Sequence, residues 1–122
     1  MRYIAMSSTQ IRFCLEDMEV AGKQIKKGDL VWLSLAAANR DPAAFENPEE
    51  LDFSRDASDV VTFGPGIHHC LGHLLAREQL AMFYKRFYEE FDSVEILDKD
   101  PAFSPAYAFR GLVALNVQCN QA

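Results

Sequence analysis

The feature that most limits the fold of this chain is the loop formed by residues 63–72, which reads FGPGIHHCLG. Three of its residues are glycines, which lack a Cβ and let a backbone pass close to a ligand. Apolar residues then recur at helical spacing, at Leu80, Phe83, Tyr84, Phe87 and Phe91. The sequence therefore predicts a ligand-facing loop directly before a long helix over about residues 71–90.

Cys70 carries the chemistry of this loop. Free backbone N–H groups and the positive end of the helix dipole gather at a helix N-terminus, and both favour a thiolate over a thiol. A thiolate is a soft metal ligand. The other cysteines, Cys14 and Cys119, are widely spaced and leave an odd total, which is a poor disulfide framework and fits a reducing compartment. We expect Cys14 to act as a small buried hydrophobic residue.

The rest of the chain predicts a mixed α+β domain. Apolar and polar residues alternate within residues 10–32 around turn signals at Gly22 and Gly28, which indicates short strands. Residues 33–38 fit a short helix, and residues 39–62 show no period and should form an irregular segment pinned by aromatic residues. Terminal strands are expected within 94–118, over 94–97 and 112–117. The length of 122 residues predicts a single domain.

Charge and hydropathy exclude some classes of partner. A net charge of -6 disfavours nucleic acid, because binding backbone phosphates requires clustered Lys and Arg. The longest nearly apolar stretch, residues 30–38, falls far short of the roughly 20 residues that span a membrane, and the N-terminus lacks the apolar region of a signal peptide. We therefore expect a cytoplasmic protein with no membrane partner.

Zinc is an alternative metal for this region. The nitrogen and sulfur atoms of His68, His69, Cys70 and His73 are ligands that zinc accepts. Neighbouring residues on an extended loop point in different directions, so about two of the four could converge. No second cluster such as C-x-x-C supplies the remaining ligands, which disfavours zinc.

The loop matches F-G-x-G-x-H-x-C-L-G at every fixed position, and the chain resembles the C-terminal, haem-binding portion of a bacterial-type cytochrome P450. Residues 2–5 look like the end of the family's K helix, with Arg2 as the arginine of its E-x-x-R pair. Residues 38–53 are similar to the family's meander. Two positions depart from the pattern: Gln79 stands where the family often has Glu, and Glu50 where many members place Arg or His.

The resemblance implies roles for individual residues. Cys70 would be the axial thiolate ligand of the iron of haem b, and Arg12 and His68 would bind the haem propionates. The other cofactor-binding positions it implies are Phe63, Gly64, Gly66, Leu71, Gly72 and Ala76. The segments that would face substrate contain Ser8 and Thr9 and, near the other end, Ala108 and Phe109. His69 and His73 have no fixed role in the pattern and are expected to face solvent or a redox partner. Trp32 and the aromatic stripe of the helix are expected in the core.

The function implied by the resemblance is that of a haem-thiolate monooxygenase acting on a small hydrophobic substrate. Its electrons would come from a ferredoxin or a flavoprotein reductase. We expect the oxygen-activating helix and the Glu of E-x-x-R to lie outside this sequence, so catalysis by this chain alone stays open. The alternative is a truncated, catalytically inactive fragment that acts as a binding or assembly module. Its partner would be a second copy or a complementary N-terminal P450 half, which covers surface that a longer relative buries.

Overall fold

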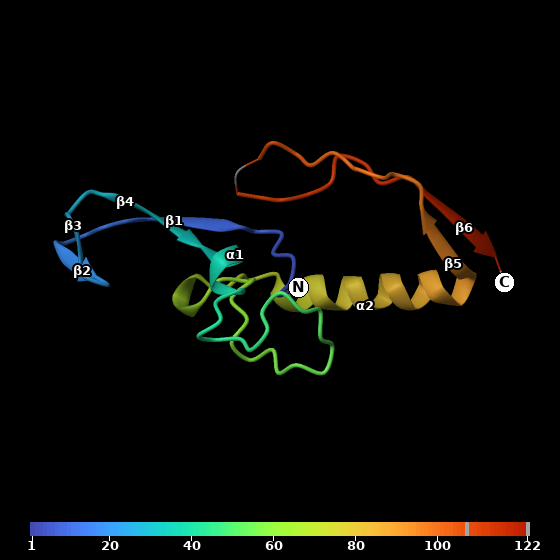
Figure 1. Ribbon diagram of the computed structural model, residues 1–122, viewed down its shortest axis with the longest axis horizontal. Coiled ribbons are helices and arrows are strands. Elements are labelled where there is room, and N and C mark those ends of the chain that lie inside the picture. Colours follow the sequence, from blue (N-terminus) through green and yellow to red (C-terminus); the bar gives the residue numbers. More distant parts are fainter. Residues whose placement is uncertain (107, 122) are drawn as a thin grey trace. The chain divides into compact units, whose positions relative to one another are not determined.

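The structure is a computed structural model that describes residues 1–106 and 108–121, and it contains both short strands and helices (Figure 1). The chain divides into two compact units. The N-terminal unit comprises Met1–Gly64 and Ala106–Arg110, and the C-terminal unit comprises Pro65–Pro105 and Gly111–Ala122.

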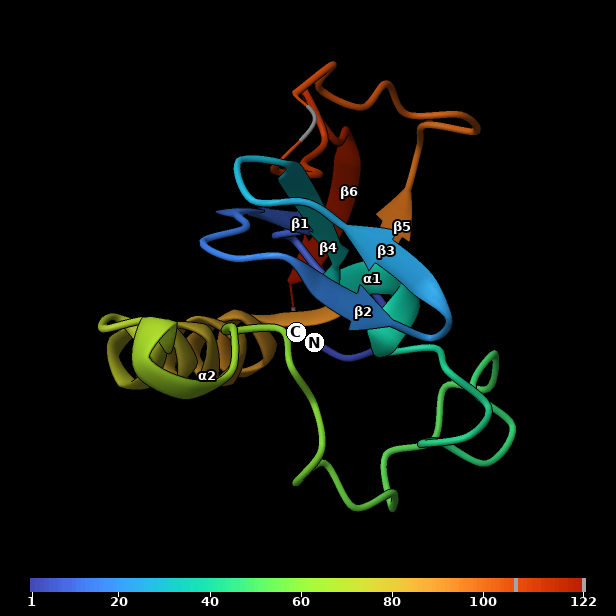
Figure 2. The ribbon, with the colours of Figure 1, turned by 90° about the vertical axis from the view of Figure 1, so that its left-hand side faces the viewer.

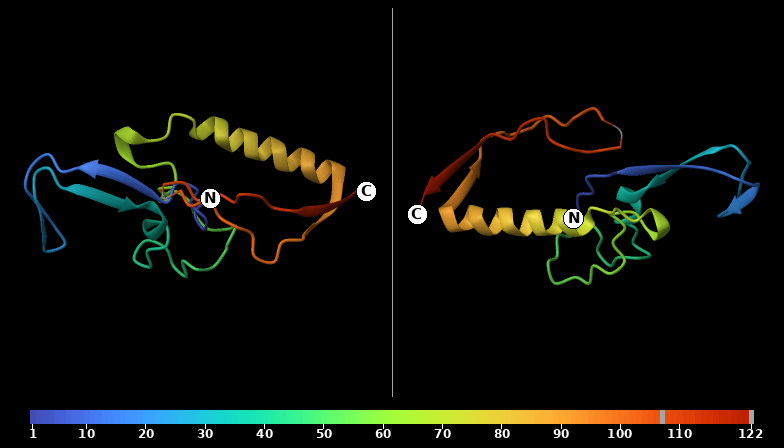
Figure 3. Two further views of the ribbon diagram at one scale, coloured as in Figure 1. Left: turned by 90° about the horizontal axis from the view of Figure 1, so that it is seen from above. Right: turned by 180° about the vertical axis from the view of Figure 1, so that it is seen from behind.

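Short antiparallel strand pairs form the first part of the N-terminal unit. Strand β1 (Thr9–Phe13) pairs with β4 (Leu30–Ser34), and β2 (Met18–Val20) pairs with β3 (Lys23–Ile25). The turn between β2 and β3 places Gly22 at a φ of +76°, where glycine has no steric penalty. Residues 10–32, which the sequence predicts as strands, therefore contain two hairpin-type pairings, visible in Figure 3.

A short helix and an irregular segment follow β4. Helix α1 (Leu35–Ala38) begins at Ser34, whose Oγ accepts a hydrogen bond from the Ala37 N–H at 3.2 Å, as an N-cap residue does. Beyond it, the chain loops without a regular element as far as residue 62 (Figure 2). Asp41, Asp52 and Asp56 each accept the backbone N–H two residues later. These local bonds satisfy the backbone without a repeating pattern, which is why this segment shows no period in the sequence.

The buried residues of the described chain lie in the N-terminal unit. Its apolar core contains Ala5, Cys14, Leu35 and Phe45, and the buried polar side chains are those of Asn39 and Thr62. The prediction that Cys14 is buried is confirmed: it is 7% exposed, and its thiol donates a hydrogen bond to the Glu16 carbonyl.

The C-terminal unit is built on one long helix. A 3-10 turn, η1 (Gly66–His68), leads into helix α2 (His73–Glu90), and α2 continues directly into β5 (Phe91–Ile96). Strand β6 (Val117–Gln121) pairs antiparallel with β5. The sequence predicts strands over 94–97 and 112–117 instead. In the structure the first strand begins three residues earlier, at Phe91, and the second begins five residues later, at Val117. Leu112, where the second strand was expected to begin, makes only an isolated bridge with Phe103.

Helix α2 does not form a core. Its rings contact one another along the helix: Phe83 stacks on Phe87, whose ring lies 5.1 Å from that of Phe91. Yet no residue of α2 is buried, and Phe83 is 58% exposed. The prediction that the aromatic stripe and Trp32 lie in the core is wrong, because no aromatic residue of α2 is buried and Trp32 is 54% exposed.

Candidate functional site

The loop before α2 has the backbone that its glycines permit. Gly64 and Gly66 have φ values of +76° and +67°, in the left-handed region that disfavours residues with a Cβ. Between Gly66 and α2 the chain makes one 3-10 turn and then presents Cys70, whose thiol is free and exposed. The loop therefore displays the cysteine rather than packing it.

The end of the loop joins α2 through Gly72. Gly72 is the N-cap of the helix and provides no side-chain cap, while its carbonyl accepts the Ala76 N–H at 2.9 Å. The Cys70 carbonyl accepts the His73 backbone N–H at 3.3 Å. Cys70 thus lies three residues before the first helical residue of α2.

His73 makes a contact that the sequence interpretation did not anticipate. It was expected to face solvent or a redox partner, and it is partly exposed, while its Nδ1 lies 2.9 Å from the Cys70 carbonyl oxygen. The ring of His69 meets that of His73 edge-on, with centroids 4.4 Å apart. The signal available in the sequence was a hydrogen-bonding side chain at the first position of the helix, three residues after the cysteine.

The surroundings of Cys70 fit a haem group. On either side of it, Ile67 is 98% exposed and Leu71 is 100% exposed, so two uncovered apolar side chains flank a free thiol. A Cβ built on Gly66 or Gly72 would meet no atom within 4 Å, which leaves open space beside the backbone. An apolar, open surface around a soft ligand suits a flat macrocycle with a central iron.

The two residues expected to bind propionates lie in different units. Arg12, in β1, directs its guanidinium toward its own strand and donates to the Ile11 carbonyl at 2.9 Å and to Gln10 Oε1 at 3.0 Å. His68 ends η1 in the C-terminal unit and is exposed. Each retains donor capacity, because a guanidinium has five N–H donors and an imidazole has two ring nitrogens. Phe63 and Gly64 close the N-terminal unit, with the Gly64 N–H donating to the Val61 carbonyl at 2.8 Å.

The two segments predicted to face substrate lie side by side. The Ser8 N–H donates to the Ala108 carbonyl at 3.0 Å, and Ser7 forms an antiparallel bridge with Phe109. Thr9 begins β1 opposite Ser34. Segments about a hundred residues apart in the sequence therefore form one edge of the N-terminal unit, on which Phe109 is 62% exposed.

Arg2 connects the N-terminus to the irregular segment. Its Nη1 donates to the carbonyls of Asn39 and Pro48 at 2.8 and 2.9 Å, and its Nη2 donates to the Glu50 carbonyl at 3.0 Å. The guanidinium also lies over the Phe45 ring, 5.2 Å from its centroid. Glu50, noted above as a departure from the family pattern, thus accepts from Arg2 through its backbone rather than its side chain.

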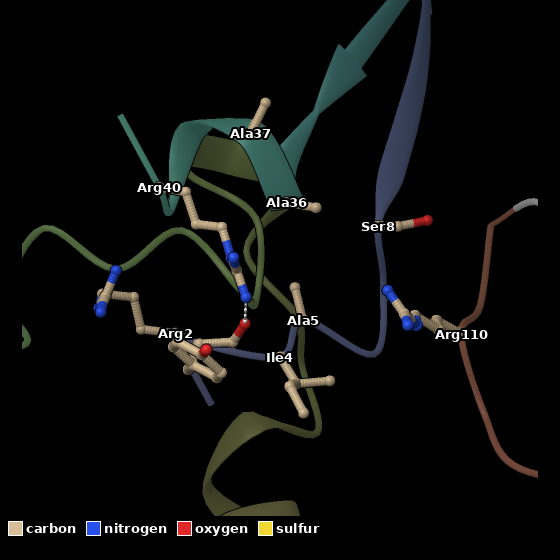
Figure 4. A pocket seen from close by; sticks show the side chains of 9 residues that line it. Arg2, Ile4, Ala5, Ser8, Ala36, Ala37, Arg40 and Arg110 are labelled. Atoms are coloured by element: carbon tan, nitrogen blue, oxygen red, sulfur yellow. Dashed lines mark hydrogen bonds between the residues drawn. The ribbon is translucent and has the colours of Figure 1, made fainter. Parts of the chain in front are cut away.

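A cavity of about 530 Å³ opens beside Arg2 and is also lined by Arg40 and Arg110 (Figure 4). Arg40 donates to the Tyr3 carbonyl at 3.0 Å, stacks on the Tyr3 ring and pairs with Glu49. The arginines Arg2 and Arg40 are therefore already engaged in holding the backbone around this cavity.

Asn39 is the most deeply buried polar residue of the described chain, with no exposed surface. Its Oδ1 accepts the Val61 N–H at 2.9 Å, and its Nδ2 donates to Thr62 Oγ1 at 3.0 Å. Asn39 therefore connects the end of α1 to the residues that precede the cysteine loop. The sequence placed Asn39 within the meander without identifying this role.

Among the described residues, no three His, Cys, Asp or Glu side chains gather as a metal-binding group. No helix in that part of the chain is long and apolar enough to cross a membrane.

Comparison with known proteins identifies the family. The family model described as "Cytochrome P450" matches residues 1–113. Cytochrome P450 165B3 of Amycolatopsis orientalis is 40% identical over 92% of this chain, and the biotin biosynthesis cytochrome P450 of Bacillus subtilis is 34% identical over 96%. The chain spans about 30% of the length of each of these relatives.

Solved structures agree with these relatives. The crystal structure of P450BioI in complex with hexadec-9Z-enoic acid ligated acyl carrier protein superposes with a TM-score of 0.92 and is 34% identical. The match covers 98% of this chain and 31% of that structure. Together with the cysteine loop and the mixed α+β elements around it, these similarities show that the chain belongs to the cytochrome P450 family.

Proposed function

We propose that this chain is the haem-binding portion of a bacterial P450 monooxygenase and corresponds to the C-terminal part of that fold. The observation that carries the proposal is the free, exposed thiol of Cys70 between the exposed side chains of Ile67 and Leu71, on a loop that leads into α2. Cys70 would be the axial ligand of a haem b iron. When bound, haem supplies the oxygen chemistry of the family.

The chain's own residues would bind and orient that group. Gly66 and Gly72 keep the backbone beside the thiol free of side chains, and Ala76 adds a small side chain in the first turn of α2. Phe63 and Gly64 would support the start of the loop. Arg12 and His68 would hold the propionates through charge-assisted hydrogen bonds.

The substrate would meet the edge formed by Ser8 and Thr9 and by Ala108 and Phe109. The hydrogen bond between Ser8 and Ala108 holds these two segments together, and the exposed Phe109 ring offers an apolar contact. A small hydrophobic substrate fits such an edge. Electrons would come from a ferredoxin or a flavoprotein reductase, as the resemblance implies.

The test is the absorption spectrum of the purified full chain after haem addition, reduction and exposure to carbon monoxide. We expect the red-shifted Soret band of a thiolate-ligated haem. Cys70→Ala should abolish the band, whereas Cys119→Ala, a matched change at another cysteine that is not buried, should leave it unchanged. Failure to take up haem would refute the cofactor assignment for this chain.

A second candidate function is assembly with another polypeptide, and the exposed surface favours it. On α2, Met82 and Tyr88 are 66% and 62% exposed, so much apolar surface is uncovered. The occupant would be a second copy or a complementary N-terminal P450 half.

Sedimentation velocity tests this candidate. The wild-type chain alone should sediment as a dimer if the occupant is a second copy. Replacing Phe83 and Tyr88 by lysine should then give monomers, whereas lysine at Phe53, which is 92% exposed in the N-terminal unit, should not. A wild-type monomer that gains no mass when mixed with the N-terminal portion of a P450 relative would exclude the assembly role.

A further inference from the structure

One residue of α2 binds the backbone of the cysteine loop through both its main chain and its side chain. His73 Nδ1 lies 2.9 Å from the Cys70 carbonyl oxygen, and its backbone N–H lies 3.3 Å from the same atom. A carbonyl oxygen only accepts hydrogen bonds, so Nδ1 must carry the proton and Nε2 must not when the ring is neutral. The edge-on contact with the His69 ring, at 4.4 Å, further limits rotation of the imidazole.

These two bonds fix one peptide plane. The described chain has no cis peptide bond, and in a trans peptide the carbonyl and the next N–H point in opposite directions. Holding the Cys70 carbonyl therefore also fixes the direction of the Leu71 N–H and the backbone dihedral ψ of Cys70. That dihedral relates the Cys70 side chain to the start of the helix, so the bond to His73 determines where the sulfur stands relative to α2.

We propose that His73 is a positioning residue for Cys70: its Nδ1–H holds the Cys70 carbonyl and thereby orients the thiolate toward the iron. The inference rests on the proposed haem-ligand function and adds a residue that the family motif leaves variable. The reason to assign this role to the side chain is geometric. The backbone N–H alone is a long donor at 3.3 Å, whereas the ring nitrogen lies at a normal hydrogen-bond distance.

A matched pair of variants separates the hydrogen bond from the shape of the side chain. Asparagine and leucine have nearly the same shape, and the asparagine Nδ2 stands close to where the histidine Nδ1 stands. His73→Asn therefore keeps a donor for the Cys70 carbonyl, and His73→Leu removes it. Both variants retain the backbone N–H.

The first readout needs no haem. In the full chain labelled with ¹⁵N-histidine, the neutral His73 ring should be in the Nδ1–H tautomer, with the signal assigned by its loss in His73→Asn. A neutral ring in the Nε2–H tautomer would overturn the inference, whatever the result with haem.

The second readout is the lifetime of the thiolate-type spectrum of the reduced, carbon monoxide-bound protein. Loss of one hydrogen bond should shorten this lifetime about five-fold in His73→Leu. His73→Asn should restore it to within about two-fold of wild type. Equal lifetimes in the two variants would overturn the positioning role. A wild-type chain with no thiolate-type spectrum would instead refute the proposed function, and the tautomer would still decide whether the hydrogen bond exists.

Discussion

Replacing Asn39 with alanine tests whether a single buried amide stabilises the approach to the cysteine loop. Asn39 has φ and ψ of -69° and -8°, a helical conformation that alanine adopts readily, so the change removes only the side chain. Two hydrogen bonds are lost, to the Val61 N–H and to Thr62 Oγ1, at about 1 kcal/mol each. The Val61 N–H is left without its acceptor in a partly buried site, which adds about 1 kcal/mol. We expect the free energy of unfolding to fall by about 3 kcal/mol.

The measurement is urea unfolding of the full chain, followed by far-UV circular dichroism and by the fluorescence of Trp32, which lies in the same unit as Asn39. Asn120→Ala is the control, because Asn120 is an exposed asparagine that makes one side-chain bond, to Ser93 Oγ. It should change the free energy of unfolding by less than about 0.5 kcal/mol. Amide exchange at Val61 should also accelerate in Asn39→Ala. If the two alanine variants are equally stable, the buried amide does not hold this region.

Three further outcomes are expected. Gly66→Ala should weaken haem uptake about five-fold, because a φ of +67° costs a residue with a Cβ about 1 kcal/mol. Gly111→Ala, at a glycine outside the cysteine loop with similar open space, should leave haem uptake unchanged; equal uptake by the two variants would contradict this. The side chain of Asn116, and next its backbone N–H, lower the pKa of Asp98 below 3.8. The hydrogen bonds from Asn116 to Asp98 are therefore fully present above pH 3.8 and are lost as the pH falls through the lowered, folded-state pKa of Asp98. An NMR titration that follows the Asn116 amide should have its midpoint below pH 3.8. Arg2→Lys should reduce the free energy of unfolding in urea by about 2 kcal/mol, because one ammonium cannot reproduce the fork that reaches three carbonyls; an unchanged urea midpoint would count against it.

The features that the sequence predicted well depend on local chemistry. The glycines of the cysteine loop were expected to let its backbone pass close to a ligand. The structure adds that Gly64 and Gly66 have positive φ values, which residues with a Cβ rarely adopt. Helical periodicity predicted the start of α2 to within two residues. The remaining error arises because the first helical residue depends on capping, and Gly72 supplies no side-chain cap that the sequence could reveal. The turn predicted at Gly28 lies between β3, which ends at Ile25, and β4, which begins at Leu30.

Features that depend on distant partners were not predictable in the same way. The contact of Ser8 with Ala108 and the burial of Asn39 join residues far apart in the chain, and no local pattern specifies them. The failed expectation for α2 has the opposite cause. Its aromatic spacing indicates a helix that is covered on one face, but Phe83 and Tyr84 are exposed in the described structure.

The exposed helix α2 and the exposed Cys70 each present apolar surface that a bound group or a packing partner could cover. A site for a flat, apolar cofactor requires open backbone and apolar side chains around Cys70 on the ligand side, and a helix with aromatic residues along its length requires a packing partner. Relatives that share this sequence are about three times as long, since the chain spans 30% of their length. The exposed aromatic residues of α2 are the apolar surface on which the proposed assembly with a second polypeptide rests. A polypeptide that buries Phe83 would restrict the motion of α2, which carries His73. Because His73 holds the Cys70 carbonyl, covering α2 should raise the affinity of the chain for haem. Measuring haem uptake with and without such a polypeptide would show whether ordering α2 strengthens the ligand loop, as positioning by His73 requires.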